Sequence, residues 1–148
     1  MHPTAERLAR RLSQRGLEIE VTQLQDSART AALAAAALGV QVGQIVKSLV
    51  FLRGDEPELV LCAGDRRVDA ARLGLRAAPA ARVREVTGFS IGGVPPLGHD
   101  AGLPTTIDSS LQRFETVWAA AGTHHDVFAV RTEALIAAIP GAVVLDVS

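Results

Sequence analysis

Two apolar runs separated by a short polar turn form the clearest pattern along the chain. Residues 45–53 and 58–63 are rich in apolar side chains, and Gly54-Asp55-Glu56-Pro57 stands between them. Apolar runs of this length bounded by Gly, Asp and Pro predict a β-hairpin, here with a four-residue loop. Apolar residues fall on both faces of the first run, so both faces of that strand are expected to be covered.

The spacing of leucine and alanine predicts two helices before the hairpin. Leu8 and Leu12 lie four residues apart among the arginines of residues 6–14, and Gly16 follows, as expected of an amphipathic helix and its end. An alanine-rich stretch that ends before Gly39 predicts a second helix. Its N-cap is expected to be one of two residues, Asp26 or Ser27.

Short strands and helices are predicted over most of the remaining chain. Extended segments are expected at residues 17–21, 105–108, 116–121, 127–130 and 143–147. One short helix is expected to begin after an N-cap at Asp69 and to end at residue 73, and another is expected over residues 83–87. A later helix is expected to begin at a Thr132 cap and to end at residue 138. Residues 111–118 also permit a helix. Residues 89–106 hold four glycines and three prolines and predict a long, ordered loop. The pattern predicts a single α+β domain over residues 1–148.

Composition narrows the class of protein. The chain has 148 residues, is 48% hydrophobic and carries a net charge of -1, which is typical of a globular protein and not of one that coats nucleic acid through a strong positive field. The sequence contains neither a signal peptide nor a membrane-spanning run. The single cysteine, Cys62, excludes an internal disulfide and favours a reducing compartment, so a cytoplasmic location is expected.

Lys47 is the only lysine in the chain, and it lies within the apolar run 45–53. An ammonium in such a segment is costly unless it is paired, neutralised or placed to meet a ligand. One interpretation is a lysine that snorkels from the edge of a strand. Because both faces of the segment are apolar, we favour a functional role.

The segment Gly92-Gly93-Val94-Pro95-Pro96-Leu97-Gly98-His99 is a second candidate for chemistry. Paired glycines let a ligand approach the backbone closely, and free N–H groups can stabilise an anion or a developing oxyanion. The alternative is a plain surface turn, but this density of glycine and proline favours a binding loop. No Gly-Lys-Ser or Gly-Lys-Thr follows, so the loop is not a nucleotide P-loop.

Metal and serine-hydrolase chemistry find little support in the sequence. His99, His124 and His125 show no i, i+4 pairing, and no CxxC accompanies them. The nucleophile elbow G-x-S-x-G is absent. Asp108, at the end of a predicted strand, can cap the following helix or reach into a pocket, and capping is the favoured role. We therefore expect neither a metal nor a cofactor.

Arginines gather in residues 66–84. They are Arg66, Arg67, Arg72, Arg76, Arg82 and Arg84, opposed locally by Asp65, Asp69 and Glu85. An ordinary solvated face is one explanation, but this density makes the segment the best candidate for contact with phosphates. The chain has no tyrosine and one tryptophan, which argues against recognition by base stacking.

Five segments, taken in order along the chain, resemble the YbaK family. They are residues 43–51 (GQIVKSLVF), 63–69 (AGDRRVD), 92–99 (GGVPPLGH), 107–108 (ID) and 117–122 (VWAAAG). The family comprises the editing domain of prolyl-tRNA synthetase and its free-standing relatives. The resemblance implies a mixed β-sheet curled into a barrel-like core, with helices packed around it.

The same resemblance implies hydrolysis of the ester between a wrong amino acid and the 3′ end of a tRNA, usually the tRNA for proline. Lys47 matches the family's lysine, which looks placed to hold the phosphate of the terminal adenosine or the aminoacyl group. Gly92 and Pro96 match the ends of the family's G-x-x-x-P loop, whose N–H groups, with that of Gly93, would take the substrate carbonyl. The resemblance also implies that water, helped by the 2′-OH of the tRNA, attacks the ester without a side-chain nucleophile, in agreement with the absence of a triad or metal motif from the sequence.

Further contacts are implied for the remaining motif residues. Substrate contacts are expected from Ser48, Val94, Pro95, Pro96, Gly98, His99, Asp108, Thr123 and His124, and tRNA contacts from Arg66 and Arg67. Residues 94–97 differ from the Ser-Pro-Phe-like sequence of other subgroups, which leaves the identity of the removed amino acid open.

The leading hypothesis is a free-standing trans-editing deacylase that binds aminoacyl-tRNA itself or acts together with an aminoacyl-tRNA synthetase. Two alternatives stay open. One is a non-catalytic binder of aminoacyl-tRNA or of a nucleotide-like ligand in the same pocket. The other is an enzyme that uses Lys47 as a Schiff-base amine or a general base.

Overall fold

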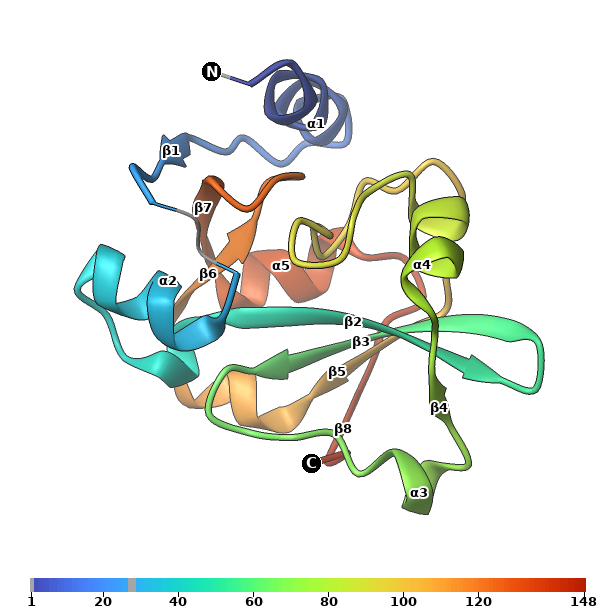
Figure 1. Ribbon diagram of the computed structural model, residues 1–148. Coiled ribbons are helices and arrows are strands. Elements are labelled where there is room, and N and C mark those ends of the chain that lie inside the picture. The colour runs from blue at the N-terminus through green and yellow to red at the C-terminus, as the bar shows by residue number, and fades with distance from the viewer. Residues whose placement is uncertain (1, 27–28) are drawn as a thin grey trace.

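The computed structural model describes residues 2–26 and 29–148 (Figure 1). Its helices are α1 (Pro3–Gln14), α2 (Ala31–Leu38), α3 (Ala70–Leu73), α4 (Ala80–Thr87) and α5 (Thr132–Ala138), with 3₁₀ turns η1 (Val42–Gln44) and η2 (Ser109–Arg113). Its strands are β1 (Val21–Gln23), β2 (Val46–Arg53), β3 (Glu56–Ala63), β4 (Arg76–Ala77), β5 (Thr105–Asp108), β6 (Thr116–Ala120), β7 (Asp126–Arg131) and β8 (Val143–Leu145). The predicted α+β class is confirmed.

The strands form two sheets that are not closed into a barrel. The larger sheet has the order β4-β2-β3-β5-β8 and the smaller one β1-β7-β6. In the larger sheet, β2 pairs antiparallel with β3 and β4, whereas β5 pairs parallel with β3 and β8. An isolated bridge between Ile45 and Trp118 connects the two sheets. A barrel requires its edge strands to pair with one another, and here β4 and β8 end the larger sheet, which corrects the expected barrel-like closure.

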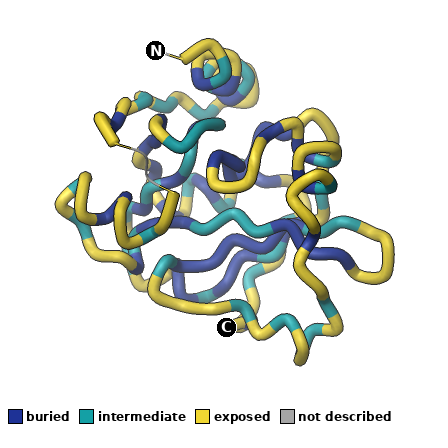
Figure 2. The backbone as a smooth tube through the Cα atoms, viewed as in Figure 1, coloured by how far each residue is buried: buried dark blue, intermediate teal, exposed yellow. Residues whose placement is uncertain are grey.

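The central hairpin is confirmed, with a tighter turn than expected. Strand β3 begins at Glu56, so only Gly54 and Asp55 form the turn, and Gly54 adopts a φ of 62°. Pro57 therefore lies inside β3. The strand tolerates it there because pairing with β5 begins only at Leu59, so the missing N–H interrupts no pairing on that side. Figure 2 shows β2 and β3 as a largely buried centre of the molecule.

Helix α2 begins later than the sequence suggested. Thr30 is its N-cap, since the Thr30 hydroxyl oxygen accepts the Leu33 N–H at 3.1 Å. Asp26 is therefore not the cap, and Ser27 lies outside the described residues. Gly39 ends the helix at a φ of 69°, as its position predicted.

Three other boundaries differ from expectation. Helix α4 already starts at Ala80, directly after Pro79. At α5 the N-cap position belongs to Arg131, and the hydroxyl of Thr132 instead donates to the Phe114 carbonyl at 2.6 Å. Strand β1 lies later than the expected segment 17–21, because β7 pairs only with residues 21–23. The Asp69 cap of α3 is confirmed.

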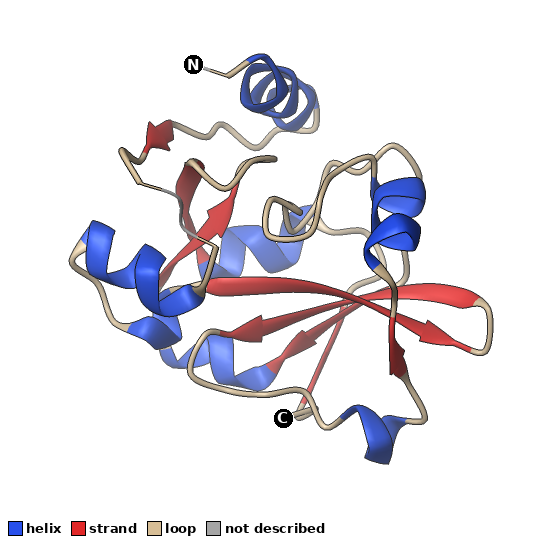
Figure 3. Ribbon diagram, in the orientation of Figure 1, coloured by secondary structure: helices blue, strands red, loops and turns tan. Residues whose placement is uncertain are grey.

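Residues 89–104 contain no helix or strand, and residues 93–99 are buried, so the predicted ordered loop is confirmed. Figure 3 shows this loop running between α4 and the connection of β6 with β7. Helix α1 packs behind it: a Cβ added at Gly98 would lie 2.7 Å from Leu8 Cδ1. The Arg11 guanidinium also donates to the Gly98 carbonyl at 2.6 Å. Helix α1 thus supports the loop from the side away from the sheets.

Within the described ranges, no helix combines the length and the apolar character that crossing a membrane requires.

Candidate functional site

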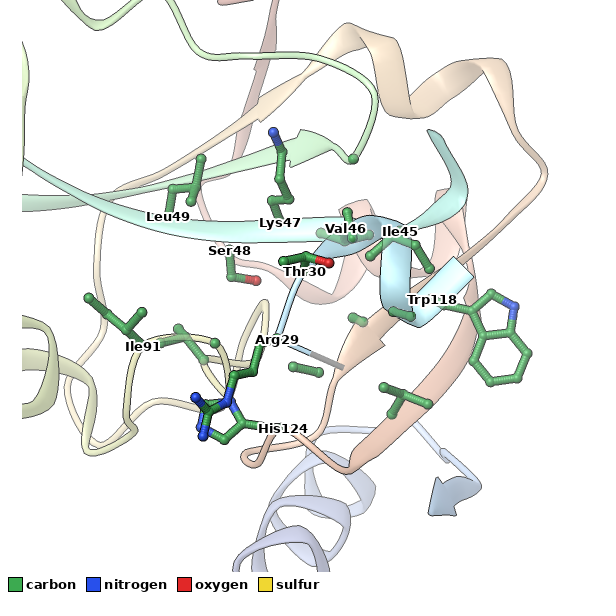
Figure 4. Close-up of a pocket in the computed structure, with 18 of the residues that line it drawn as sticks. Arg29, Thr30, Ile45, Val46, Lys47, Ser48, Leu49, Ile91, Trp118 and His124 are labelled. Atoms are coloured by element: carbon green, nitrogen blue, oxygen red, sulfur yellow. The ribbon is translucent and has the colours of Figure 1, made fainter. Parts of the chain in front are cut away.

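A cavity of about 590 Å³ opens beside strand β2 (Figure 4). Its walls come from the start of α2, strand β2, strand β6, helix α4, the loop after α4 and the loop between β6 and β7. Most lining side chains are apolar, among them Val46, Val50, Ala78, Val83 and Val94. An apolar pocket with a few polar groups is the usual form of a small-molecule site.

Strand alternation separates two neighbouring residues that the sequence proposed for the site. The Ser48 side chain points toward Ile91 and His124, whereas the Lys47 side chain points to the opposite face of β2 (Figure 4). The Lys47 ammonium donates a hydrogen bond to the Arg66 carbonyl. Lys47 is half-buried and contributes to the cavity wall, but its charged end lies at the loop that follows β3.

This position of Lys47 resembles the snorkelling lysine more than a buried catalytic amine. The apolar neighbours on its face, Leu49 and Phe51, pack with Val60 and Val147 in a separate apolar cluster. The ammonium leaves that cluster and meets a backbone carbonyl instead of an unpaired environment. This arrangement gives no support to a Schiff-base amine that acts inside the cavity.

Two buried polar side-chain atoms at the cavity have no hydrogen-bond partner among the described residues: Ser48 Oγ and His124 Nδ1. Leaving a buried polar atom unpaired costs about 1–3 kcal/mol. The hydroxyl groups of the two threonines in the wall are already engaged. The Thr30 hydroxyl oxygen accepts from Leu33, and the Thr123 hydroxyl donates to Asp126 Oδ2 at 2.5 Å.

Thr123 and Asp126 fix the loop that carries His124. The Thr123 hydroxyl oxygen accepts the N–H groups of His125 and Asp126, both at 3.1 Å, while the hydroxyl donates to the fully buried Asp126 carboxylate. The Asp126 carbonyl also accepts the Ala121 N–H at 2.8 Å. The predicted substrate residue Thr123 therefore shapes the loop and lines the cavity, with its hydroxyl already engaged.

Only part of the glycine and proline loop reaches the cavity. Gly92 and Val94 line it, together with Ile91. The Gly93 N–H donates to the Ser90 carbonyl at 2.9 Å and closes a turn. Gly93 therefore does not offer the free N–H that the sequence predicted. The Gly92 N–H meets no acceptor in the part of the chain that the structure describes, so it is the available donor.

The end of the loop has a structural role. Pro95, Pro96, Gly98 and His99 are buried and do not belong to the cavity wall. His99 Nε2 donates to the Pro95 carbonyl at 2.7 Å, and its ring meets Phe89 edge to face. Burial lowers the pKa of His99. The cavity wall gives no support to the substrate contacts expected of these four residues, and the His99 side chain instead holds the loop in shape.

Asp108 is also outside the cavity. It is fully buried and caps η2, where Oδ2 accepts the Ser110 N–H at 3.4 Å and the Ser110 hydroxyl. Its Oδ1 accepts the Val147 N–H at 2.8 Å. Although burial opposes ionisation, these hydrogen bonds hold the pKa of Asp108 below its ordinary value. The capping role favoured by the sequence is confirmed, and the expected substrate contact is not.

Arg66 and Arg67 are exposed in the loop between β3 and α3, next to the Lys47 ammonium. Asp65 anchors the start of this loop, since Arg113 donates to both of its carboxylate oxygens at 2.6 and 3.0 Å. The Arg113 guanidinium lowers the pKa of Asp65. The Lys47 ammonium, near the start of β2, therefore meets the backbone of the exposed loop that carries Arg66 and Arg67.

Sequence reasoning missed Arg29, Ile91 and Trp118, which all line the cavity. Arg29 precedes α2 and reaches the same side of the cavity as His124 in Figure 4. Trp118 lies in the segment 117–122 that resembles the family, but no sequence signal places any of the three at a pocket, because α2 and β6 come together only through the sheet bridge and the cluster beneath α2. A group of three or more His, Cys, Asp or Glu side chains able to hold a metal ion does not occur in residues 2–26 and 29–148.

Comparisons with known proteins agree with this architecture. Residues 25–138 match the family model of the aminoacyl-tRNA editing domain. An uncharacterized protein of Bacillus subtilis (strain 168), YwhH, is 36% identical over 115 residues, which cover 73% of each chain. The proline–tRNA ligase of Lactobacillus gasseri is 37% identical over 70 residues, which span 43% of this chain and 12% of the ligase. The crystal structure of a proposed trans-editing enzyme for prolyl tRNA synthetase superposes with a TM-score of 0.92 and 44% identity, covering 100% of this chain and 98% of that one.

Proposed function

The chain belongs to the aminoacyl-tRNA editing domain family, and on this premise we propose that it hydrolyses the ester of a mischarged aminoacyl-tRNA in trans. The substrate we propose is the tRNA for proline carrying a small wrong amino acid. The similarity to prolyl-tRNA ligases and to a proposed trans-editing enzyme supports this choice. A prolyl-tRNA synthetase is the corresponding partner.

The observation that carries the proposal is the meeting of three groups at one cavity. The Gly92 N–H, the Ser48 side chain and the His124 ring all border the same space, and no described residue engages them. An amino acid attached through its carboxyl group to a ribose presents a carbonyl and neighbouring hydroxyl groups. The apolar walls from Val46 and Val50 suit a small side chain.

Chemistry at this site needs positioning and charge stabilisation more than a nucleophile. Water adds to the ester carbonyl, the bond to the ribose oxygen breaks, and that oxygen takes up a proton, which releases the amino acid and a free tRNA 3′ end. The Gly92 N–H is the proposed donor to the oxyanion that develops on the carbonyl oxygen. Holding water and ester at reacting distance supplies the remaining acceleration.

The tRNA backbone is proposed to meet the cations outside the cavity. Lys47 and Arg29 belong to the cavity wall, and the Lys47 ammonium bonds to the exposed loop that carries Arg66 and Arg67. Phosphate contacts of this kind position a nucleic acid without reading its bases. In this proposal Lys47 holds a phosphate near the terminal nucleotide and takes no part in bond breaking.

A panel of mischarged tRNAs tests the proposal. Transfer RNA for proline carrying Ala, Ser, Thr or Cys is incubated with the wild type, His124→Ala and His125→Ala. His125 is the matched control, since it is adjacent and exposed but not part of the cavity wall. We expect the wild type and His125→Ala to clear at least one ester much faster than buffer does, and His124→Ala to be slow. If the wild type binds these tRNAs and clears none of the esters, the non-catalytic binder replaces the deacylase.

A further inference from the structure

Gly92 packs directly against the imidazole of His124. A Cβ added at Gly92 would lie 2.7 Å from His124 Nδ1 and 2.9 Å from Cε1, closer than real Cβ atoms approach other heavy atoms. Gly92 also has a φ of +88°, which side chains rarely adopt. The absence of a side chain at residue 92 therefore determines where the histidine ring can lie.

The neighbouring glycines extend this contact between the two loops. A Cβ at Gly93 would lie 2.8 Å from the Gly122 carbonyl oxygen and 3.0 Å from Thr123 Cα. Gly93 thus packs against the backbone of Gly122 and Thr123, with no room for a side chain between them, while Gly92 packs against the ring of His124. Asp126 fixes the second loop from inside the protein through Thr123, so His124 cannot retreat by moving its backbone alone.

This packing orients the two ring nitrogens of His124 differently. The Nδ1 atom is enclosed beside Gly92 and has no hydrogen-bond partner among the described residues. The Nε2 atom is not among the enclosed atoms and has no protein partner in those residues either. Since His124 lines the cavity, Nε2 is the nitrogen left to meet a bound molecule.

We infer that Gly92 is a positioning residue, which acts through His124 by keeping the Nε2 atom directed at the aminoacyl ester and its attacking water. This inference rests on the proposed deacylase function and adds a second role for Gly92 beside its N–H donor. His124 then makes the contact with the reacting groups, and Gly92 sets the geometry of that contact. Alanine at position 92 keeps the backbone N–H, so Gly92→Ala tests the positioning role separately from the donor role.

A double-mutant cycle separates this role from an independent one. The variants are Gly92→Ala, His124→Ala and the double variant, measured as kcat and KM on the ester that the wild type clears fastest. A displacement of about 1 Å can cost on the order of 10²-fold in rate, so we expect each single variant to lose about that factor in kcat. Because both substitutions act through the same imidazole, the kcat of the double variant should lie within about threefold of the kcat of His124→Ala.

Gly88→Ala is the matched control for backbone strain. Gly88 also has a positive φ, +82°, and a Cβ there would meet the exposed carboxylate of Asp100, at 2.7 Å, away from the cavity wall. The end of a flexible side chain can move aside, so Gly88→Ala should keep its rate within about threefold. If Gly88→Ala loses as much activity as Gly92→Ala, strain explains the effect and the inference fails.

Imidazole ¹H–¹⁵N NMR provides a readout that does not need activity. Gly92→Ala should shift the ring nitrogen resonances of His124, whereas Gly88→Ala should leave them unchanged. Unchanged His124 resonances in Gly92→Ala would overturn the inference, as would a double variant whose loss is the product of both single losses. If no ester is cleared by the wild type, the proposed function fails, yet the spectra still decide whether Gly92 positions the ring.

Discussion

Replacing Asp108 by asparagine removes a buried charge that joins the start of η2 to the segment after β8. The carboxylate accepts the Ser110 N–H, the Ser110 hydroxyl and the Val147 N–H, and it is fully buried. Asparagine has the same shape but only one oxygen. Its NH₂ group must therefore face at least one N–H donor that the second carboxylate oxygen accepted in the wild type.

The cost follows from these contacts. A hydrogen bond to a charged group contributes roughly 1.5–3 kcal/mol, and a buried N–H left without a partner costs about 1–3 kcal/mol. Asparagine keeps one acceptor, and the lost hydrogen bond and the unpaired N–H partly describe the same contact. We therefore expect Asp108→Asn to lose about 2–4 kcal/mol of unfolding free energy. For a chain of this size each kcal/mol lowers Tm by about 2–4 °C, so the midpoint should fall by roughly 5–15 °C.

The pH dependence provides a second signature. The folded-state pKa of Asp108 is lowered, so its contribution to stability is complete above the pKa of the unfolded chain, about 3.9, and is lost as pH falls through the lower folded value. The Tm difference between wild type and Asp108→Asn should be constant at neutral pH and shrink in acid below about pH 4.

Thermal unfolding followed by circular dichroism measures both effects, and deacylation at a temperature well below either midpoint measures function. Asp65→Asn is the control, because that carboxylate is partly exposed and its pair with Arg113 should contribute only about 0–1 kcal/mol. An Asp108→Asn protein that keeps its Tm but loses deacylation would refute the capping role and place the carboxylate at the substrate.

Three further predictions concern the charged rim and the buried thiol. Lys47→Ala should lower kcat/KM by about tenfold or more, equivalent to ~1.4 kcal/mol, and change the unfolding free energy by at most ~1 kcal/mol. Lys47→Arg should not restore activity, since a broad guanidinium replaces a compact ammonium. Full activity of Lys47→Arg would contradict this prediction. The double variant Arg66→Ala/Arg67→Ala should raise KM and leave kcat unchanged. It should also reduce the slope of log KM against log salt concentration by about 0.7–0.9 for each phosphate that it no longer binds, whereas the control Arg72→Ala should keep the wild-type slope. An unaltered slope in the double variant would show that the tRNA binds another part of the surface. Burial raises the pKa of Cys62 to about 11, so native protein at pH 8 should react with iodoacetamide roughly two orders of magnitude more slowly than unfolded protein, and equal rates would show that the thiol is accessible.

Much of the local structure could be predicted because neighbouring residues determine it. The β2–β3 hairpin, the Gly39 end of α2, the Asp69 cap and the long ordered loop all follow from apolar spacing or from residues suited to turns and caps. Where the ends of helices and strands differ from the prediction, contacts with distant parts of the chain are the reason. Strand β1 exists only where β7 offers a partner, and the hydroxyl of Thr132 serves Phe114 instead of its own helix.

Site residues were harder to assign, because a motif identifies a segment but not the direction of each side chain. Lys47 and Ser48 are neighbours in one strand and still face opposite sides, and the ammonium reaches the loop after β3. His99 belongs to the same motif as Gly92 but turns inward to Pro95. Arg29 lies in no motif, Trp118 lies in one that did not point to a pocket, and both join the cavity wall only when α2 and β6 come together.

The order of residues along the chain was enough to predict the secondary structure of the centre, the presence of a shaped glycine loop and the family to which these motifs point. Packing in three dimensions determines which polar groups share a cavity. It also determines that the Gly93 N–H donates to a carbonyl within a turn and that Gly92 packs on His124. The physical reason is the distance along the chain between the residues that interact. Turns, caps and strand patterns depend on residues a few positions apart, whereas the contacts of Gly92 with His124 and of Asp108 with Val147 join segments that are brought together only by packing around the common core.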